Sequence, residues 1–246
     1  MQEVTIKWLE TVDSTQEAIR RGLPDLANLS VVAARNQTAC RGQRGNKWNT
    51  RPGENLTFSI LLRPGKDGIP AIMVADSFRI SEVSALAVRD VLEDFGIPTQ
   101  IKWPNDIYAG DRKICGMLIE NILRGGSVSE SIIGIGLNVN QTAFDPELPN
   151  PVSMARLTGR TFATEAVLQA LLGHFCLLLE TDPAGVRQRF LDALYRKEQW
   201  HAYTDCATGE VFEGMIKGIS KRGLLRVGMP DGRIREFGFK EIAYII

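Results

Sequence analysis

The sequence predicts an α+β fold in which helices flank a mixed, largely antiparallel sheet, followed by a small β-barrel. Apolar, strand-type segments follow one another with short connections that suit antiparallel hairpins, at 29–34, 56–62, 101–103, 113–122 and 131–140. Apolar residues recur at helical spacing in three longer segments, at 77–95, 164–180 and 184–200. Beyond residue 200, glycine turns break the chain into short strands, which is typical of a small barrel. We therefore expect one domain over residues 1–200 and a second over 201–246.

The first helix is predicted to begin near Ser14. Ser14 and Glu17 have the spacing of a capping box, in which the two side chains satisfy the first free backbone N–H groups of a helix. The hydroxyl groups of Ser14 and Thr15 should therefore lie at the N-terminus of a helix.

A polar loop separates the strands predicted at 29–34 and 56–62. It contains no acidic residue before Glu54. It carries five cationic residues: Arg35, Arg41, Arg44, Lys47 and Arg51. Glycines in the loop leave the backbone free to wrap around an anion such as a phosphate. A solvated surface loop would have the same composition. The indole of Trp48 favours a functional role, because a large aromatic ring can cover a nucleotide base.

The helix predicted at 77–95 ends before Gly96, and Lys102 follows it in a short strand that Pro104 ends. Lys102 lies between two bulky apolar residues, so we expect its ammonium group to be partly enclosed and to need an anionic partner. That partner is either Asp106, in a structural ion pair, or the carboxylate or phosphate of a ligand. The sequence leaves both alternatives open.

Glycines interrupt two of the later apolar strands. Gly116 weakens its strand unless something needs the vacant space, and a flat ring is one such occupant. In 133–140 the apolar residues alternate with Gly134, Gly136, Asn138 and Asn140, which gives one apolar face and one small, hydrogen-bonding face. These glycines indicate a ligand lying flat on the strand, a β-bulge, or the close approach of a helix. The segment lacks the third glycine of a dinucleotide-binding fingerprint.

Composition limits the classes of function. Lys and Arg number 29, as do Asp and Glu, so the chain as a whole has no net charge to attract nucleic acid or an anionic membrane. No apolar segment approaches the roughly 18 residues of a membrane span, and no signal peptide is apparent. The four cysteines are scattered without a C-x-x-C pair, which favours reduced, individually buried thiols over a zinc or redox site. We expect a cytoplasmic protein without a metal site of its own.

Five segments taken in order closely resemble the biotin protein ligase family: 13–16, 37–48, 102–106, 113–120 and 134–140. The resemblance implies a catalytic domain like that of class II aminoacyl-tRNA synthetases, with a small Src-homology-like barrel. It also implies that the chain activates biotin with ATP and Mg²⁺ and transfers biotin to a lysine of a biotin carboxyl carrier protein. A homodimer is possible. The first motif begins at Asp13, which leaves no room for a preceding DNA-binding domain, so we expect no DNA binding.

The resemblance also implies the residues of the site. Biotin contacts are expected from Ser14, Thr15, Gln16, Gln37, Arg41, Gly42, Gln43, Lys102, Gly116 and Leu118. ATP contacts are expected from Arg41, Arg44, Trp48, Lys102 and Asn138. Lys102 and Arg41 are the expected catalytic cations, which neutralise the biotin carboxylate and the α-phosphate as they approach each other. The loop departs from the family pattern at Cys40, Gln43 and Asn46, which replace a glycine and two arginines.

Two other functions are compatible with parts of the sequence. A lipoate protein ligase would use the same reaction on a related fold, but the loop around Arg41 and the 102–106 motif favour biotin. A non-catalytic single-stranded nucleic-acid binding protein would explain the basic loop, Trp48 and the small barrel. The net charge of zero speaks against that second alternative.

Overall fold

The computed structural model describes residues 4–39, 48 and 51–246, and its larger part is built on a seven-stranded sheet. The strand order is β1-β2-β3-β7-β6-β5-β4. The strands are β1 (Ile6–Val12), β2 (Val31–Gln37), β3 (Leu56–Leu62), β4 (Gln100–Lys102), β5 (Asp106–Ala109), β6 (Arg112–Arg124) and β7 (Ser127–Leu137). β1 and β2 run parallel, and every other neighbouring pair is antiparallel. The prediction of a mixed, largely antiparallel sheet is confirmed.

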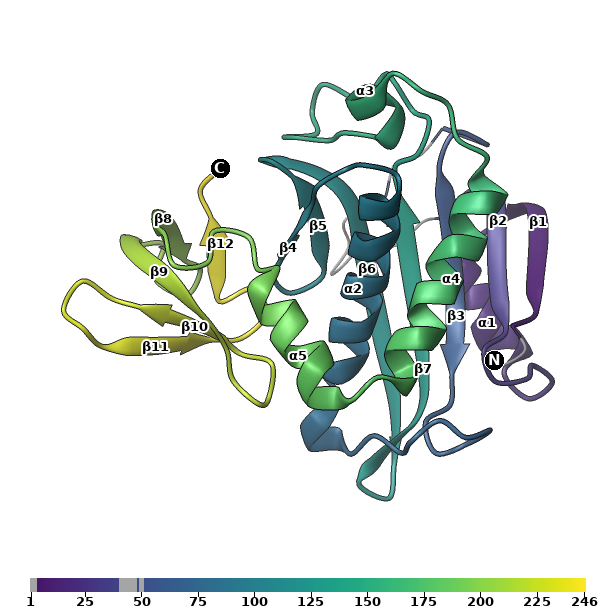
Figure 1. Ribbon diagram of the computed structural model, residues 1–246, viewed down its shortest axis with the longest axis horizontal. Coiled ribbons are helices and arrows are strands. Elements are labelled where there is room, and N and C mark those ends of the chain that lie inside the picture. The colour runs from purple at the N-terminus through teal and green to yellow at the C-terminus, as the bar shows by residue number, and fades with distance from the viewer. Residues whose placement is uncertain (1–3, 40–47, 49–50) are drawn as a thin grey trace.

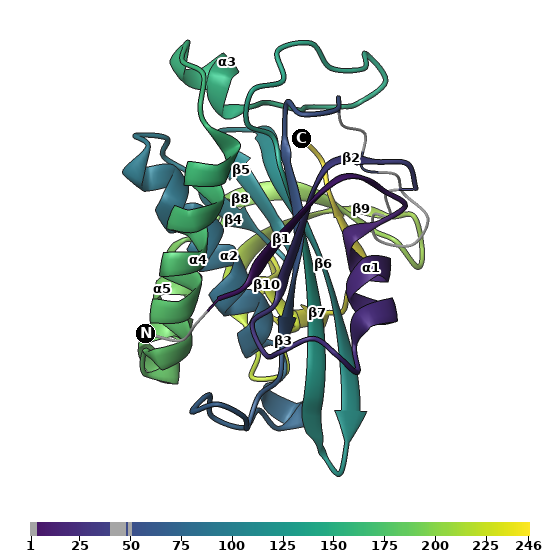
Figure 2. The same cartoon turned by 90° about the vertical axis from the view of Figure 1, so that its right-hand side faces the viewer.

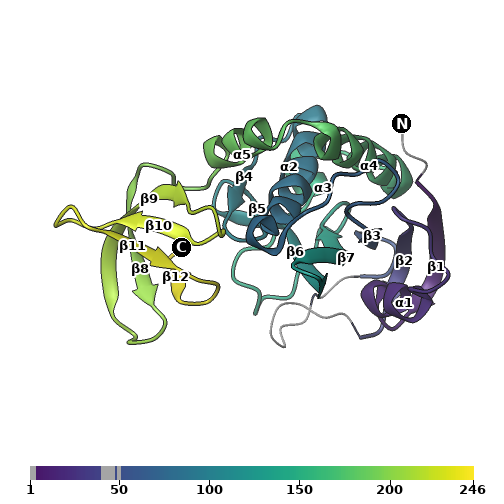
Figure 3. The same ribbon diagram turned by 90° about the horizontal axis from the view of Figure 1, so that it is seen from below.

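Helices cover both faces of this sheet (Figures 1 and 2). α2 (Arg79–Asp94), α4 (Thr164–Glu180) and α5 (Pro183–Asp192) lie on one face, and α1 (Thr15–Gly22) packs against β2, β3 and β7 on the other (Figure 3). Two short helices, η2 (Val74–Asp76) and α3 (Met154–Thr158), lie in the connections. All seven residues of β3 are buried. Both faces of this strand are therefore covered, and the faces include the buried polar residues Thr57 and Ser59.

The C-terminal residues form a second, antiparallel sheet of five strands in the order β11-β10-β9-β8-β12. Its strands are β8 (Trp200–Asp205), β9 (Val211–Ile219), β10 (Leu225–Gly228), β11 (Ile234–Phe237) and β12 (Ile242–Tyr244). The sheet begins within one residue of the boundary expected at 200/201. Its closure into a barrel and the division of the chain into two domains stay predictions.

Hydrogen bonds, one of them buried, join the C-terminal part of the chain to the large sheet and its helices. The indole Nε1 of Trp103 donates to the backbone oxygen of Gly223 over 2.9 Å. The guanidinium of Arg187, on α5, donates to the backbone oxygens of Ile219 and Ser220, each over 2.8 Å. Because buried backbone oxygens are costly to leave unpaired, these contacts fix the C-terminal sheet beside β4 and β5.

Several element boundaries differ from the sequence prediction, and left-handed backbone accompanies two of these differences. The helix expected over 184–200 ends at Asp192, since Ala193 and Tyr195 form backbone hydrogen bonds with Ile101. Arg196 and Glu198 then adopt left-handed backbone, with φ of 60° and 58°. The strand expected over 29–34 begins two residues later, since Leu29 also has a positive φ, of 59°. It then continues to Gln37 because its polar end pairs with β1.

The cysteine prediction is only partly confirmed. Cys115 is buried and unpaired, as expected, and burial raises the pKa of its thiol. Cys176 is half-buried and Cys206 is exposed, so the prediction of individually buried thiols is wrong for Cys206. Cys40 lies outside the described residues. Among the described helices, none combines the length and apolar character of a membrane-spanning segment.

Candidate functional site

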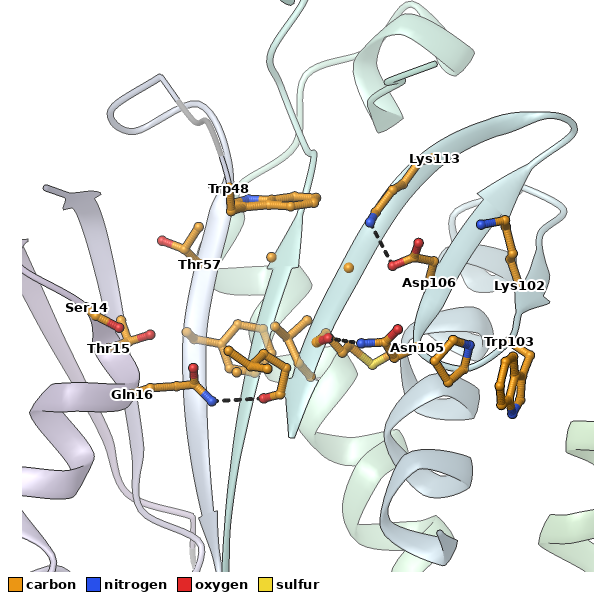
Figure 4. Close-up of a pocket in the computed structure, with 18 of the residues that line it drawn as sticks. Ser14, Thr15, Gln16, Trp48, Thr57, Lys102, Trp103, Asn105, Asp106 and Lys113 are labelled. Atoms are coloured by element: carbon orange, nitrogen blue, oxygen red, sulfur yellow. Dashed lines mark hydrogen bonds and ion pairs between the residues drawn. The ribbon is translucent and has the colours of Figure 1, made fainter. Parts of the chain in front are cut away.

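A cavity of about 280 Å³ lies on the face of the large sheet that carries α1, and it reaches the C-terminal sheet. The structure brings eight of the predicted site residues together in its lining: Ser14, Thr15, Gln16, Gln37, Trp48, Lys102, Gly116 and Leu118. Figure 4 shows Ser14, Thr15 and Gln16 on one side of the cavity and Lys102 on the other. The volume approaches the lower end of the roughly 300–1,000 Å³ usual for small-molecule sites.

Neutral hydrogen-bonding groups form one end of the cavity, where α1 begins. The backbone N–H of Thr15 donates to Oε1 of Gln37 over 2.8 Å, and its hydroxyl is 2.8 Å from that of Ser59. The amide Nε2 of Gln16 donates to the backbone oxygen of Leu118 over 2.9 Å. Ser14 is the N-cap as predicted, but its side chain makes no capping hydrogen bond, so the expected capping box is not formed. We call this group the amide end.

The floor of the cavity is a stripe of glycines on β6 and β7. Gly116 pairs with Gly136 across the two strands, and Gly134 pairs with Leu118. A Cβ atom on Gly136 would lie 2.5 Å from Cε2 of Trp48, and one on Gly134 would lie 2.9 Å from Cδ of Gln16. Pairing is unbroken along this stretch, so the β-bulge alternative is wrong here. Gly134 instead lets Gln16 of α1 approach the sheet closely, and Gly136 leaves room for the indole of Trp48.

The indole of Trp48 lies over this floor (Figure 4). Its Nε1 is buried and has no hydrogen-bond partner among the residues that the structure describes. A buried donor without a partner is costly. It therefore marks a position at which an acceptor on a ligand would be stabilised.

Cationic side chains form the other end. Nζ of Lys113 makes an ion pair with Oδ1 of Asp106 at 2.7 Å and lies 5.7 Å from the centre of the Trp48 ring. Because Asp106 pairs with Lys113, the prediction that Asp106 is the ion-pair partner of Lys102 is wrong. We call the region of Lys113, Asp106 and Lys102 the cationic end.

Lys102 is enclosed by aromatic rings instead of a carboxylate. Its Nζ lies 4.6 Å from the ring centre of Tyr244, on β12, and 5.1 Å from that of Tyr108, on β5. Burial lowers the pKa of Lys102 from its usual value, and the negative charge of Asp106 opposes this shift. The alternative in which a ligand anion completes the surroundings of Lys102 stays open.

Sequence reasoning missed Lys113 as a site residue. Lys113 and Gly116 are three positions apart, so regular strand alternation places them on opposite faces of β6. The register shifts, however, since Ile107 pairs with Cys115 while the next residue, Tyr108, pairs with Lys113. This bulge brings the Lys113 amine within 3.1 Å of where a Cβ atom on Gly116 would lie. Tyr244 was missed because it comes from the remote C-terminal sheet.

Asn138 does not lie where the sequence predicts. The strand expected over 131–140 ends at Leu137, and the Asn138 amide Nδ2 donates to the backbone oxygen of Val152 over 3.0 Å. The side chain thus anchors the segment before α3 and is absent from the cavity lining that the structure describes. The strand therefore ends one residue before Asn138, and the contact of Asn138 with a nucleotide stays a prediction.

Four predicted site residues lie outside the described residues: Arg41, Gly42, Gln43 and Arg44. The expected convergence of Arg41 and Lys102 therefore stays a prediction.

Comparisons with known proteins agree with this geometry. Residues 8–138 match the model of the biotin/lipoate A/B protein ligase family. The chain is 31% identical over 237 residues to a biotin–[acetyl-CoA-carboxylase] ligase of Paracoccus denitrificans, covering 92% of this chain and 95% of that protein. It is 33% identical over 172 residues to the bifunctional ligase/repressor BirA of Bacillus spizizenii, covering 66% of this chain and 50% of that protein.

Among solved structures, the fold matches the biotin protein ligase of Aquifex aeolicus in complex with biotin and ATP. The TM-score is 0.79, at 26% identity and 97% coverage of both chains. Because the family model spans more than half of its length, this chain belongs to the biotin/lipoate A/B protein ligase family.

Proposed function

We propose that this chain is a biotin protein ligase, which converts biotin and ATP to biotinyl-5'-adenylate and then transfers biotin to a lysine of a biotin carboxyl carrier protein. One observation carries the proposal: a single cavity has neutral amide and hydroxyl groups at one end, and its lining also contains three lysines, Lys102, Lys113 and Lys240. Biotin has the complementary form, with a neutral hydrogen-bonding ureido ring and a carboxylate at the end of a chain. The relative from Paracoccus denitrificans, which this chain matches over nearly its whole length, is named for this activity.

In the first step a carboxylate oxygen of biotin attacks the α-phosphorus of ATP, and the bond to pyrophosphate breaks. Both reactants are anions, so the main task of the protein is to neutralise charge and align them. Lys102 is the proposed amine that bridges the carboxylate and the α-phosphate, as the resemblance implies. Lys113 lies beside Trp48 above the glycine stripe and is a second candidate cation for this step. Mg²⁺ enters with ATP as part of the nucleotide substrate.

In the second step the amine of the carrier lysine attacks the acyl carbon of the adenylate, and AMP leaves. The amine must lose a proton to become a nucleophile. Asp106 is a candidate acceptor for this proton, since its carboxylate lines the cavity at the cationic end. Trp48, and the loop residues Arg41 and Arg44, are the proposed cover of the nucleotide.

Other parts of the proposal come from the sequence alone. A cytoplasmic location suits a reaction that consumes ATP. A lack of DNA binding and a homodimeric state remain predictions.

The direct test is to incubate the protein with MgATP and either biotin or lipoate, and to detect the acyl-adenylate by mass spectrometry. Addition of a carrier domain with an unmodified lysine should then give a mass gain that requires biotin. Formation of lipoyl-adenylate instead would identify a lipoate ligase. Salt-dependent binding of oligonucleotides without ATP turnover would favour the nucleic-acid binding alternative.

Replacement of Lys113 tests its assignment. Lys113→Ala should lower biotin-dependent pyrophosphate exchange by two or more orders of magnitude, because loss of one charge-stabilising group costs about 2.7–4 kcal/mol in the transition state. Lys197→Ala is a matched control, since Lys197 also forms an ion pair, with Asp192 at 3.0 Å, and lies outside the cavity lining. Equal exchange rates in Lys113→Ala and the control would remove Lys113 from the mechanism.

A further inference from the structure

The C-terminal part of the chain contributes a lysine to the lining of the cavity. Lys240 lies in the turn before β12 and lines the cavity together with Ile242 and Tyr244 of that strand. In the part of the chain that the structure describes, four charged residues line the cavity: Lys102, Asp106, Lys113 and Lys240. When the three amines are protonated, positive charge exceeds negative charge in this lining although the chain as a whole is neutral.

The backbone at Lys240 has a conformation that is unfavourable for lysine. Its φ is 65°, in the left-handed region where a Cβ atom comes too close to the following carbonyl oxygen. Glycine adopts this region without that strain. Residues held in such conformations persist only where the surrounding structure fixes them, and they gather at functional sites. Turn chemistry alone therefore does not explain a lysine at this position.

Contacts on both sides of Lys240 fix the turn. The backbone N–H of Gly238 donates to Oε2 of Glu241 over 2.6 Å, and the N–H of Glu241 donates to the backbone oxygen of Gly238 over 3.1 Å. The ring of Phe239 packs against the indole of Trp103, with 5.3 Å between the ring centres. The turn is thereby tied to the segment that follows β4, so the backbone of Lys240 has a fixed position at the cavity.

The amine of Lys240 is available to a ligand. Among the described residues it forms no ion pair, because Asp106, the carboxylate of the described lining, pairs with Lys113 at 2.7 Å. The carboxylate of Glu241, next in the chain, accepts the hydrogen bond from Gly238. Lys240 is exposed, so binding an anion does not require it to break a contact within the protein.

The distribution of charge indicates the kind of anion. The amide end offers only neutral groups, so the anionic parts of the ligands are stabilised where the lysines lie. The C-terminal segment reaches the cavity at the cationic end, since the ring centre of Tyr244 lies 4.6 Å from Nζ of Lys102. A single carboxylate would leave part of this positive charge without a partner. The phosphate chain of a nucleotide carries several negative charges and suits it better.

We propose that Lys240 binds a phosphate group of the nucleotide substrate, so that the C-terminal sheet contributes a cation to the site at which the adenylate forms. Lysine carries a compact charge on a flexible stem, so it can follow a phosphate without a strict geometry. This inference rests on the proposed function, because it takes ATP as the second substrate.

Lys240→Gly in the whole chain separates binding from stability, because glycine removes the amine and relieves the left-handed backbone. The variant should unfold at the same temperature as the wild-type chain or a higher one. It should raise KM for ATP in biotinyl-adenylate formation about five- to ten-fold, the size of one charged contact at a partly exposed site. KM for biotin should change less than two-fold. Lys240→Arg should retain the wild-type KM for ATP, and high salt should reduce the difference between Lys240→Gly and the wild type.

Two controls match the backbone and the charge. Glu198→Gly also relieves left-handed backbone, with φ of 58°, and Lys217→Gln removes an exposed amine from β9 of the same sheet. Both residues lie outside the described cavity lining, so both variants should keep every KM. An unchanged KM for ATP in Lys240→Gly, or a rise in KM for the carrier domain alone, would overturn the inference. If Lys240→Gly does not fold, Lys240→Asn must show the same rise, because asparagine also tolerates left-handed backbone. If the wild-type chain makes no biotinyl-adenylate, the proposed function fails instead.

Discussion

A methyl group added to Gly134 or to Gly136, both on β7, should weaken the binding of one substrate and not the other. In Gly134→Ala the new Cβ atom would lie 2.9 Å from Cδ and 3.1 Å from Nε2 of Gln16. Gln16 is 6% exposed, and its amide is tied to the backbone oxygen of Leu118, so it has little room to retreat. In Gly136→Ala the Cβ atom would instead lie 2.5 Å from the Trp48 indole. Neither glycine has a positive φ, so alanine fits the backbone at both positions.

The size of the effect follows from these contacts. Displacing Gln16 weakens one neutral hydrogen bond, which contributes roughly 0.5–1.5 kcal/mol. Overpacking costs about 1–3 kcal/mol, and the preference of a strand for alanine over glycine returns roughly 0.5–1 kcal/mol. We therefore expect Gly134→Ala to lose about 1–3 kcal/mol of stability. It should also raise KM for biotin about ten-fold, because the amide end no longer has its fixed geometry.

The assay is steady-state release of pyrophosphate with each substrate varied in turn, with thermal unfolding to check that both variants fold. Gly134→Ala should act mainly on KM for biotin, whereas Gly136→Ala should act mainly on KM for ATP, because it displaces Trp48. Each variant is the control for the other, since both add one methyl group to the same strand. The reasoning would be refuted if both variants changed the same KM by the same factor.

Two further predictions concern Lys102 and the hydrogen bond between Trp103 and Gly223. Burial lowers the pKa of Lys102 below its usual value of 10.5. Only the protonated amine attracts phosphate. The value of kcat/KM for ATP should therefore decrease as the pH rises through that lowered pKa. Lys102→Arg should abolish this alkaline limb in a pH profile, because a guanidinium stays protonated. Trp103→Phe removes the buried hydrogen bond to the backbone oxygen of Gly223 and should lower the free energy of unfolding by about 1–3 kcal/mol in urea titrations. An unchanged midpoint would show that the bond contributes nothing.

Periodicity predicted the elements whose burial is uniform along their length. The helix predicted over 164–180 and the strand predicted over 56–62 have the observed bounds, because one helix face and all of β3 are buried in the core. The helix predicted over 184–200 failed beyond Asp192. There the chain turns because the backbone N–H of Glu198 bonds to the oxygen of Ile216 in the C-terminal sheet, a long-range contact that local periodicity does not contain.

For a similar reason, the sequence predicted some residues of the candidate site and missed others. Residues in contiguous motifs, such as Ser14, Thr15 and Gln16, were found together and do line one cavity. Lys113 was missed because a one-residue bulge between β5 and β6 changes the side of the strand on which it lies, and no local pattern in the sequence predicts that bulge. Tyr244 was hidden because the packing of two separate sheets, rather than any motif, brings it to the cavity.

The two ends of the cavity depend on different parts of the fold. The amide end is tied to strands of the large sheet alone, through Gln37 on β2, Ser59 on β3 and Leu118 on β6. The cationic end depends on the β5–β6 bulge and on Tyr244, which comes from the C-terminal sheet. A shift of the C-terminal sheet would therefore move the surroundings of Lys102 while the amide end keeps its geometry. In the proposed mechanism such a shift alters the neutralisation of the reacting anions at Lys102, and it leaves the hydrogen bonds of the amide end unchanged.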